Sequence, residues 1–396
     1  MLDILKIIGR DGELFNSDIS SAQTKLSSII QSSKFLIIGA AGSIGQSVTI
    51  ELMKREPKIL HAVDISENNM VELVRTVRSS LGYTGGDFKT FAIDCGSREF
   101  KALCDRHGPY DYVFNLSALK HVRSEKDPFT LMRMIRVNIL NTLLTVNIAR
   151  SFKAQNYFCV STDKAANPVN MMGASKRIME LFLARESISQ KITMARFANV
   201  AFSDGSLLHG FNQRILKRQP ITAPNDIRRY FVTPKEAGEL CLLSGIFGQN
   251  RDTFFPKMSE KLHLESFSNI SDRYLRALGY EPYYCDSEQQ ARSFFDQQSK
   301  SNFWPVYYFS SDTTGEKSVE EFFTSDEKID WNLYDGVGVI KNNFFHDSGA
   351  LDEFLDRLSA IEKQNIWEKS DFLELFQILL PNFDHTETGR DLDGRM

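Results

Sequence analysis

A hydroxyl, a carboxyl and an amine follow one another at Thr162, Asp163 and Lys164, directly after the apolar run at 157–160. Such side chains can divide acid and base work between them when their surroundings shift their pKa values. A solvated charged pair that opens a loop is the alternative. We favour the chemical interpretation, because the apolar run predicts a buried strand and parallel sheets bind ligands where their strands end.

Met172 and Lys176 stand four residues apart in the segment that follows. Lysine carries charge and donates hydrogen bonds, whereas methionine has no ionisable group and can neither take nor release a proton. Either another residue supplies the base, or the protein has lost its chemistry. A surface lysine and a packed methionine on a helix over 173–184 are the plainer alternatives.

A glycine-rich turn lies between the apolar run at 35–38 and a helical pattern at 47–54. Its sequence at 39–45, Gly-Ala-Ala-Gly-Ser-Ile-Gly, has the spacing GxxGxxG. The first glycine permits a tight turn, the second lets backbone N–H groups approach a pyrophosphate, and the third permits close helix packing. Asp64 ends a second apolar run, where a carboxylate accepts hydrogen bonds from a ribose 2′-hydroxyl and repels a 2′-phosphate. We therefore predict NAD as the cofactor; a surface turn and a helix N-cap at Asp64 are the alternatives.

Further residues at strand ends complete the expected cofactor site. Asp94 follows the run at 89–93 and is expected to hold the adenine amino group, while the backbone of 116–118 lines the cofactor. The predicted cofactor residues are Gly39, Ala41, Gly42, Ser43, Ile44, Gly45, Asp64, Asp94, Leu116, Ser117 and Ala118.

These strands alternate with segments of helical periodicity, such as 129–150. The alternation predicts an α/β protein with a doubly wound parallel sheet of the Rossmann type. After residue 200 the rhythm weakens, which indicates a smaller substrate lobe. We expect an N-terminal helical segment at 1–33, a dinucleotide-binding domain at 34–200, a substrate lobe at 201–330 that is discontinuous with it, a helical extension at 331–384 and a disordered tail at 385–396.

The helical extension contains two amphipathic stretches, 351–358 and 372–380. Their apolar faces need a partner, either the substrate lobe or an oligomer interface. The polar and aromatic stretch at 281–312 has no clear period and predicts a long loop or an inserted excursion.

Composition excludes several classes of function. The 396 residues are 25% charged with a net charge of -4, so there is no basic excess for nucleic acid or an anionic membrane. The five cysteines are an odd number without metal-like spacing, which favours reduced thiols and a cytoplasmic location. With no apolar run of membrane length and no signal-peptide pattern, we predict no membrane span, no metal site and no nucleic-acid partner.

Five segments together resemble the extended short-chain dehydrogenases, and within them the UDP-N-acetylglucosamine 4,6-dehydratases of the polysaccharide-biosynthesis group. The resemblance runs from about residue 30 to about residue 325 and implies a soluble form with a tightly bound, recycled NAD, a UDP-sugar substrate and a homo-oligomer. A dehydratase of this kind passes a hydride from sugar C4 to NAD+, eliminates water across C5 and C6, and returns the hydride to C6. The segments are 39–45, 115–122, 161–165, the Met172 and Lys176 pair, and 196–200.

The resemblance gives the candidate catalytic residues separate roles. Lys164 is the base for the C5 proton, and burial beside the positive nicotinamide is expected to favour its neutral form. Asp163 is the acid for the departing 6-hydroxyl if its surroundings keep it protonated, and Thr162 is placed to bond the C4 oxygen. Lys176 orients the nicotinamide ribose. The group that deprotonates the 4-hydroxyl stays open among Asp163, Thr162 and water.

Met172 occupies the position at which most such enzymes have a tyrosine. Family members with tyrosine are associated with inversion at C5, and a subgroup with methionine is associated with retention. The resemblance therefore implies the product UDP-2-acetamido-2,6-dideoxy-α-D-xylo-hexos-4-ulose, a precursor of bacillosamine- or legionaminic-type sugars.

Substrate contacts are expected from loops that follow the strands and from the second lobe. Charged candidates match phosphate oxygens, although each is equally well a solvated surface group, and His121 is equally well a turn cap. The Gly-Glu-Lys element at 315–317 departs from the family pattern, because Thr313 and Thr314 replace an arginine and a proline. The predicted substrate residues are Lys120, His121, Arg196, Asn199, Arg229, Tyr230 and Glu316.

Three other functions compete with a C5-retaining dehydratase. A nucleotide-sugar epimerase uses the same hydride shuttle but generally relies on the missing tyrosine, and a C5-inverting dehydratase differs only in stereochemistry. A catalytically inactive dinucleotide-binding subunit would explain Met172 as decay. The joint presence of Thr162, Asp163, Lys164 and Lys176 argues against decay.

Overall fold

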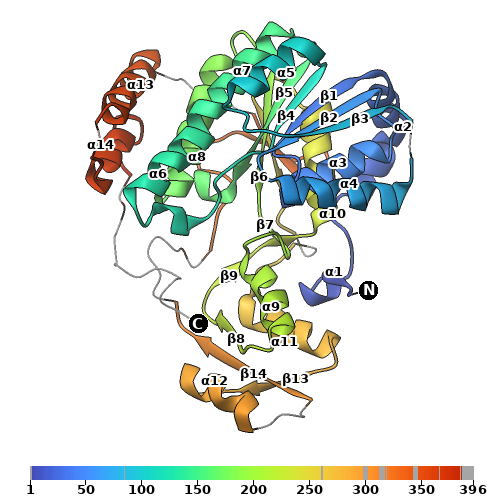
Figure 1. The fold of residues 1–396 in the computed structure, drawn as a ribbon, viewed down its shortest axis with the longest axis vertical. Helices are drawn as coiled ribbons and strands as arrows, with labels where there is room; N and C mark the ends of the chain where they lie inside the picture. Colours follow the sequence, from blue (N-terminus) through green and yellow to red (C-terminus); the bar gives the residue numbers. More distant parts are fainter. Residues whose placement is uncertain are drawn as a thin grey trace.

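The computed structural model describes residues 2–83, 85–259, 262–297, 302–311, 317, 319–341, 347–364, 366–383 and 385. These residues form a large sheet between two layers of helices, with a smaller lobe below it (Figure 1). None of the helices in these ranges combines the length and the apolar character needed to cross a membrane.

The main sheet has the strand order β15-β16-β11-β6-β5-β4-β1-β2-β3. From β3 to β11 neighbouring strands run parallel, whereas β16 and β15 are antiparallel additions at one edge. Strands such as β4 and β6 are buried along their whole length, as expected for a parallel sheet covered on both faces. The bounds are β1 (Lys34–Ile38), β2 (Ile59–Asp64), β3 (Asp87–Ala92), β4 (Tyr112–Asn115), β5 (Asn156–Thr162), β6 (Ile192–Phe197), β11 (Asp252–Pro256), β15 (Ile329–Asp330) and β16 (Val337–Lys341).

The predicted doubly wound parallel sheet is confirmed, with the 3-2-1-4-5-6 order of a Rossmann fold. The sheet extends further along the chain than the prediction of a domain at 34–200. β11 comes from the range assigned to the substrate lobe, and β16 comes from the range assigned to a helical extension. The domain boundary at residue 200 is therefore corrected, because the chain returns from the lobe to the sheet.

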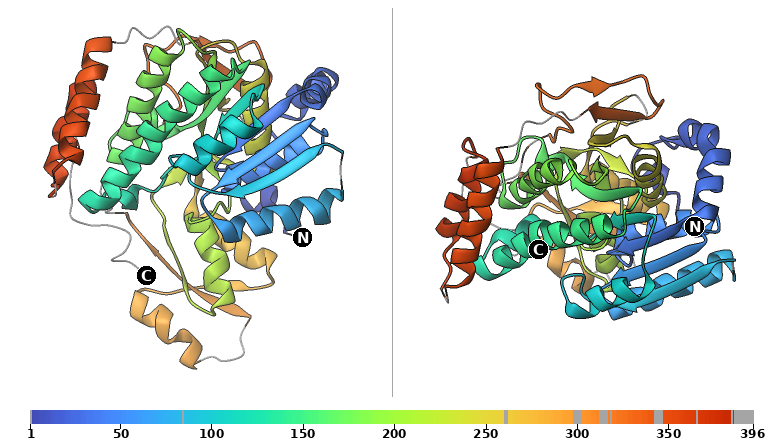
Figure 2. Two further views of the ribbon diagram at one scale, coloured as in Figure 1. Left: turned by 45° about the horizontal axis from the view of Figure 1, so that its top comes forward. Right: turned by 90° about the horizontal axis from the view of Figure 1, so that it is seen from above.

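Helices cover both faces of the sheet (Figure 2). One apolar core joins the sheet to α2 (Asn16–Ser32), α3 (Ser43–Met53), α4 (Glu67–Leu81) and α10 (Pro234–Leu242). The core on the other face joins it to α5 (Arg98–His107), α6 (Pro128–Ile135), α7 (Asn141–Ser151) and α8 (Met171–Glu186).

The smaller lobe has a core of its own around a three-stranded parallel sheet. Residues 281–312 were predicted as a long loop or an inserted excursion; they supply two of its strands and a helix, so the loop alternative was wrong. The N-terminal helix α1 packs on α11 in this lobe. The bounds are α1 (Ile4–Ile7), α9 (Leu207–Leu216), β8 (Ile221–Pro224), α11 (Phe267–Ala277), β13 (Glu281–Tyr284), α12 (Glu288–Gln297) and β14 (Phe303–Phe309), with the short pairs β7 (Asn199–Val200) with β10 (Phe231–Val232) and β9 (Arg228–Arg229) with β12 (Glu265–Ser266).

The C-terminal helices α13 (Ser348–Glu362) and α14 (Lys369–Leu379) form a hairpin (Figure 1). Its apolar face joins the core beside α6 and α8, where the rings of Phe354 and Phe182 lie 5.7 Å apart. The two amphipathic helices were predicted. They pack on α8 and not on the substrate lobe, because α8 supplies the apolar surface that their own apolar faces need. Residues 386–396, predicted as a tail, lie outside the described residues.

Candidate functional site

Two cavities open on either side of the glycine-rich turn, at the carboxyl ends of the strands. The first has a volume of about 390 Å³ and the second about 370 Å³. Gly42, Leu116 and Ala118 line both cavities, so a molecule that passes over this turn can reach from one into the other. This is the position at which a doubly wound sheet binds its ligands.

The turn itself requires glycine at two positions. Gly39 has φ +77°, and a Cβ there would lie 2.6 Å from the backbone nitrogen of Ser117. A Cβ on Gly45, at the first turn of α3, would lie 2.0 Å from the carbonyl oxygen of Gly39. Any side chain would therefore force the turn apart. The backbone approaches itself as closely as a dinucleotide fold demands, so these residues fit a bound pyrophosphate at the N-terminus of α3.

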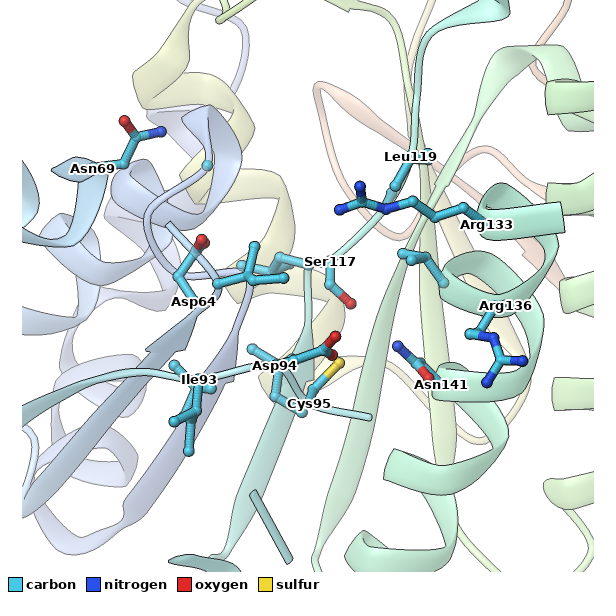
Figure 3. Close-up of a pocket in the computed structure, with 18 residues that line it drawn as sticks. Asp64, Asn69, Ile93, Asp94, Cys95, Ser117, Leu119, Arg133, Arg136 and Asn141 are labelled. Carbon is cyan, nitrogen blue, oxygen red and sulfur yellow. The ribbon is translucent and has the colours of Figure 1, made fainter. Parts of the chain in front are cut away.

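The first cavity gathers the predicted adenosine contacts (Figure 3). Asp64 accepts hydrogen bonds from the backbone N–H of Ala41 at 2.9 Å and of Ser66 at 2.8 Å, so its carboxylate ties the glycine turn to the end of β2. Asp94 accepts the N–H of Gly96 at 2.8 Å. Both carboxylates lie on the cavity wall, where the sequence expected them.

Two arginines at this cavity were missed by sequence reasoning. Arg133 of α6 extends its guanidinium over the cavity, and Arg136 lies one turn further along (Figure 3). Arg136 is also paired with Glu362 of α13. Arg133 and Arg136 are three residues apart, a spacing that places both side chains on one face of a helix. Periodicity alone does not tell whether that face meets the cavity.

The second cavity brings together most of the predicted catalytic and substrate residues. Lys120, His121 and Asn199 line it with five candidates from the end of β5, the turn that follows it and α8. An apolar wall made by Leu207, Leu208, Phe231 and Phe267 of the smaller lobe closes the other side. The five candidates are Thr162, Asp163, Lys164, Met172 and Lys176.

The end of β5 builds a compact hydrogen-bonded corner. Thr162 Oγ1 donates to Asp163 Oδ1 at 2.9 Å, and the backbone N–H of Lys164 donates to the same oxygen at 2.9 Å. Lys164 Nζ donates to it as well, at 3.1 Å. The three residues therefore meet at one carboxylate oxygen, in a turn that leaves Asp163 only 3% exposed.

Lys164 also faces a second carboxylate. Its Nζ lies 3.6 Å from Oε1 of Glu320, and Nη2 of Arg229 lies 3.9 Å from that oxygen. Burial alone lowers the pKa of Lys164, but the charges of Asp163 and Glu320 outweigh burial and raise it. The expected neutral lysine is therefore corrected: in this structure the two carboxylates favour the ammonium. We define Asp163, Lys164, Glu320 and Arg229 as the Lys164 cluster.

Glu320 was missed by sequence reasoning. It belongs to the chain after the Gly-Glu-Lys element at 315–317, where the run Val319-Glu320-Glu321 gave only a weak signal. Glu316, the predicted contact from that element, lies outside the described residues.

Met172 and Lys176 lie one helical turn apart on α8, which begins where Asn170 accepts the N–H of Gly173 at 2.8 Å. Lys176 Nζ donates to the carbonyl oxygen of Val160 on β5 at 3.1 Å, and burial lowers its pKa. Met172 is 3% exposed and contributes to the cavity wall. The helix therefore holds the amine of Lys176 at the end of β5 and places beside it the side chain of Met172, which has no ionisable proton.

Lys120 and His121 come from the loop after β4. Burial lowers the pKa of Lys120, and burial together with the charges of Lys120 and Arg123 lowers that of His121. A Cβ on Gly205, which has φ +71°, would lie 2.7 Å from His121 Nε2. The imidazole therefore packs directly on the backbone of the loop from the smaller lobe.

Arg196 is the clearest correction among the predicted substrate residues. It is fully buried and does not line either cavity. Its guanidinium donates to Glu180 at 2.7 and 3.0 Å and to Glu327 at 2.7 and 2.8 Å. Burial would raise the pKa of Glu180, but Arg196 lowers it to about 2. We define Arg196, Glu180 and Glu327 as the Arg196 cluster; its arginine has no donor directed at a substrate.

Arg229 and Tyr230 are also absent from the cavity walls. Arg229 donates to the carbonyl oxygen of Arg228 at 2.9 Å and stands behind Glu320. The ring of Tyr230 packs 5.7 Å from that of Phe322, and its carbonyl oxygen accepts the N–H of Asn199 at 3.0 Å. Both residues support the cavity from outside in this structure.

Comparison with known proteins agrees with this architecture. The structure of Pen from Bacillus thuringiensis superposes with a TM-score of 0.64 at 20% identity, covering 88% of this chain and 99% of Pen. That of WbmF from Bordetella bronchiseptica in complex with NAD+ has a TM-score of 0.50 at 14% identity and covers 61% of this chain and 77% of WbmF. These likenesses show that the chain belongs to the class of proteins with this Rossmann-like fold.

Within that class the chain belongs to the polysaccharide biosynthesis protein family, which its sequence matches over residues 35–341. It is 28% identical to the uncharacterized membrane protein MJ1061 of Methanocaldococcus jannaschii, over 65% of this chain and 76% of that protein. It is 27% identical to the capsular polysaccharide biosynthesis protein CapD of Staphylococcus aureus, over 66% of this chain. The match spans 43% of CapD, less than half of its length.

Proposed function

We propose that the protein is an NAD-dependent dehydratase that converts UDP-N-acetylglucosamine into its 4-keto-6-deoxy derivative with retention at C5. The observation that carries the proposal is the corner at the end of β5, where Thr162, Asp163 and Lys164 meet at one oxygen beside the glycine turn. Family membership supports a role in polysaccharide biosynthesis.

The residues around the first cavity fit a dinucleotide. Gly39 and Gly45 leave space for its pyrophosphate, Asp64 suits a ribose 2′-hydroxyl, and Lys176 reaches the strand end where a nicotinamide ribose would lie. A bound NAD+ would supply the hydride acceptor for oxidation at sugar C4 and, once reduced, the hydride donor for C6.

Four proton transfers remain for the protein, and they balance within the corner. Asp163 takes the proton of the 4-hydroxyl through Thr162, whose hydroxyl already donates to it. Lys164 in its neutral form takes the C5 proton, and Asp163 gives its proton to the 6-hydroxyl, which leaves as water. Lys164 then returns a proton to C5, so each group ends as it began.

Met172 supports the stereochemical part of the proposal. A tyrosine at this position could deliver a proton to the sugar, but methionine cannot. One amine both removes a proton from C5 and returns one after its N–H groups exchange with solvent, so the new proton arrives on the face that the first one left. This single-base scheme predicts retention at C5, in agreement with the resemblance to the methionine subgroup.

The test is incubation of the purified protein with UDP-N-acetylglucosamine in deuterated water, followed by NMR and mass spectrometry. We expect loss of water, solvent deuterium at C5, retained C5 configuration and little need for added NAD. An epimer of unchanged mass would overturn the dehydratase in favour of an epimerase, and an inverted C5 would overturn retention. Absence of turnover with UDP- and GDP-sugars would favour a binding subunit.

A further inference from the structure

Glu320 is a buried carboxylate that the proposed proton transfers do not use. It is 5% exposed and reaches the catalytic corner from a part of the chain 156 positions away from Lys164. The charged groups that face it are Lys164, Asp163, Arg229 and Lys317. An inference about its role rests on the proposed function, in which Lys164 is the base at C5.

The corner has a problem of proton balance. An ammonium cannot take a proton from C5, yet Asp163 and Glu320 together favour the ammonium form of Lys164. Binding of the sugar displaces water from the second cavity. This change destabilises the ammonium, because fewer solvent dipoles now surround it. Its proton therefore needs an acceptor that is already in place.

Two carboxylates are close enough to be that acceptor, and their surroundings differ. Asp163 Oδ1 accepts hydrogen bonds from Thr162, from the backbone of Lys164 and from Lys164 Nζ, all within 3.1 Å. A proton from Lys164 on that oxygen would oppose these donors, and the proposed reaction already needs an ionised Asp163 to receive the proton of the 4-hydroxyl. The contacts of Glu320 are longer, 3.6 Å to Lys164 and 3.9 Å to Arg229, and burial raises its pKa. Glu320 therefore loses less when it becomes neutral.

We propose that Glu320 is the proton acceptor of Lys164, so that filling of the cavity converts the ammonium and carboxylate pair into a neutral amine and a carboxylic acid. The N–H bond of Lys164 breaks, the O–H bond of Glu320 forms, and no charge enters or leaves the pair. Lys164 is then free to take the C5 proton and return it. Glu320 touches no substrate in this scheme, so it is a positioning residue that sets the protonation state of the base.

The first experiment measures the amine directly and needs no turnover. The purified protein is treated briefly with dilute acetic anhydride over a range of pH, and acetylation of Lys164 is quantified by mass spectrometry. In Glu320→Gln we expect the curve to shift to lower pH, with about tenfold more labelling at neutral pH for each pKa unit lost. Glu321→Gln is the matched control, because its side chain is 56% exposed and its oxygen is bound by Asn167.

The control should reproduce the wild-type curve. Coincident curves for the wild type and Glu320→Gln would overturn the proposal, whichever sugar the protein converts. Failure of the proposed function is recognised separately, because the wild-type protein would then label as described but release no water from UDP-N-acetylglucosamine.

The second experiment measures kcat for dehydration against pH. In the wild type Lys164 and Glu320 share one proton. Activity falls at low pH only when the pair gains a second proton, which leaves Glu320 as a carboxylic acid and Lys164 as an ammonium. In Glu320→Gln the amine must lose its proton to solvent, so the acid limb of the profile moves to higher pH. Glu320→Asp, which keeps the carboxylate, should restore the wild-type limb at a lower maximum. A merely structural role predicts a uniformly lower kcat with unmoved limbs, and that result would overturn the proposal.

Discussion

Two buried charge clusters lie at the ends of β5 and β6, and two stretches of chain contribute residues to both. Ser161 of β5 donates to Glu180 in the Arg196 cluster at 2.7 Å, and the next residue, Thr162, donates to Asp163 in the Lys164 cluster. Residues 320–327 likewise contribute Glu320 to one cluster and Glu327 to the other. Neighbouring positions on the same segments thus serve two environments.

The clusters differ in how completely their charges are paired. Arg196 makes four hydrogen bonds of 2.7–3.0 Å to two carboxylates and a fifth to the carbonyl oxygen of Phe322 at 2.8 Å. In the Lys164 cluster the contacts of Lys164 with the carboxylates of Asp163 and Glu320 are 3.1 and 3.6 Å long, and Asp163 and Lys164 line a cavity. Tight, closed pairing fixes a protonation state, whereas loose pairing beside a cavity allows it to change. We therefore regard the first cluster as structural and the second as chemical.

The largest effect is expected from Lys164→Ala. Loss of the base at C5 should lower the rate of dehydration by about 10³-fold, within the range for a general base. Stability should also fall, because Asp163 and Glu320 lose a cation, but by less than on removal of Arg196, since the contacts of Lys164 are longer and 18% of its side chain is exposed. Product formation is followed by NMR and unfolding by urea titration. Wild-type rates in this variant would remove Lys164 from the mechanism and dissolve the contrast between the clusters.

Arg196→Met should have the opposite signature. Removing the guanidinium leaves Glu180 and Glu327 buried without their cation, which costs about 3–5 kcal/mol of unfolding free energy. Urea denaturation measures the loss. The fraction that stays folded should retain dehydration near the wild-type rate per active site, because Arg196 lines neither cavity. A stable variant with lost activity would instead support the original prediction of a substrate contact.

The contrast also predicts how stability depends on pH. Arg196 lowers the folded-state pKa of Glu180 to about 2 from an ordinary 4.5. A lowered pKa means that the contribution is present above pH 4.5 and is lost as the pH falls toward 2. Its size is roughly 3 kcal/mol by linkage. Urea midpoints measured across this window should fall steeply in the wild type and less steeply in Glu180→Gln. Parallel slopes would contradict the pairing.

The sequence located the parts of the site that depend on local geometry. Gly39 and Gly45 are required by a turn within one βα unit, and Asp64 follows from its place at a strand end. The end of β5 was found for the same reason. Such rules concern residues close together in the chain, so they need no knowledge of tertiary packing.

The parts that failed depend on packing between distant segments. Arg196 lies on a strand buried on both faces, so alternation could not tell whether its side chain points to a cavity or to Glu180. The contact of Glu320 with Lys164 joins positions far apart in the chain. The sequence therefore could not predict this contact, nor the raised pKa of Lys164 that depends on it. In the same way, residues 303–309 form β14 because they pair with β8, and no local sequence pattern reveals that pairing.

The smallest and most discriminating effects are expected at two adjacent hydroxyls. Ser161→Ala removes a hydrogen bond to the buried, ionised Glu180 and should cost about 1–2 kcal/mol of stability with little loss of rate. Thr162→Val removes the hydroxyl that donates to Asp163 and should lower the dehydration rate about tenfold, with a stability change below about 1 kcal/mol. Each variant is the control for the other, since both alter one hydroxyl on β5. Equal effects on rate and stability in the two would mean that the clusters act as one unit, and the division between structural and chemical charges would then have to be abandoned.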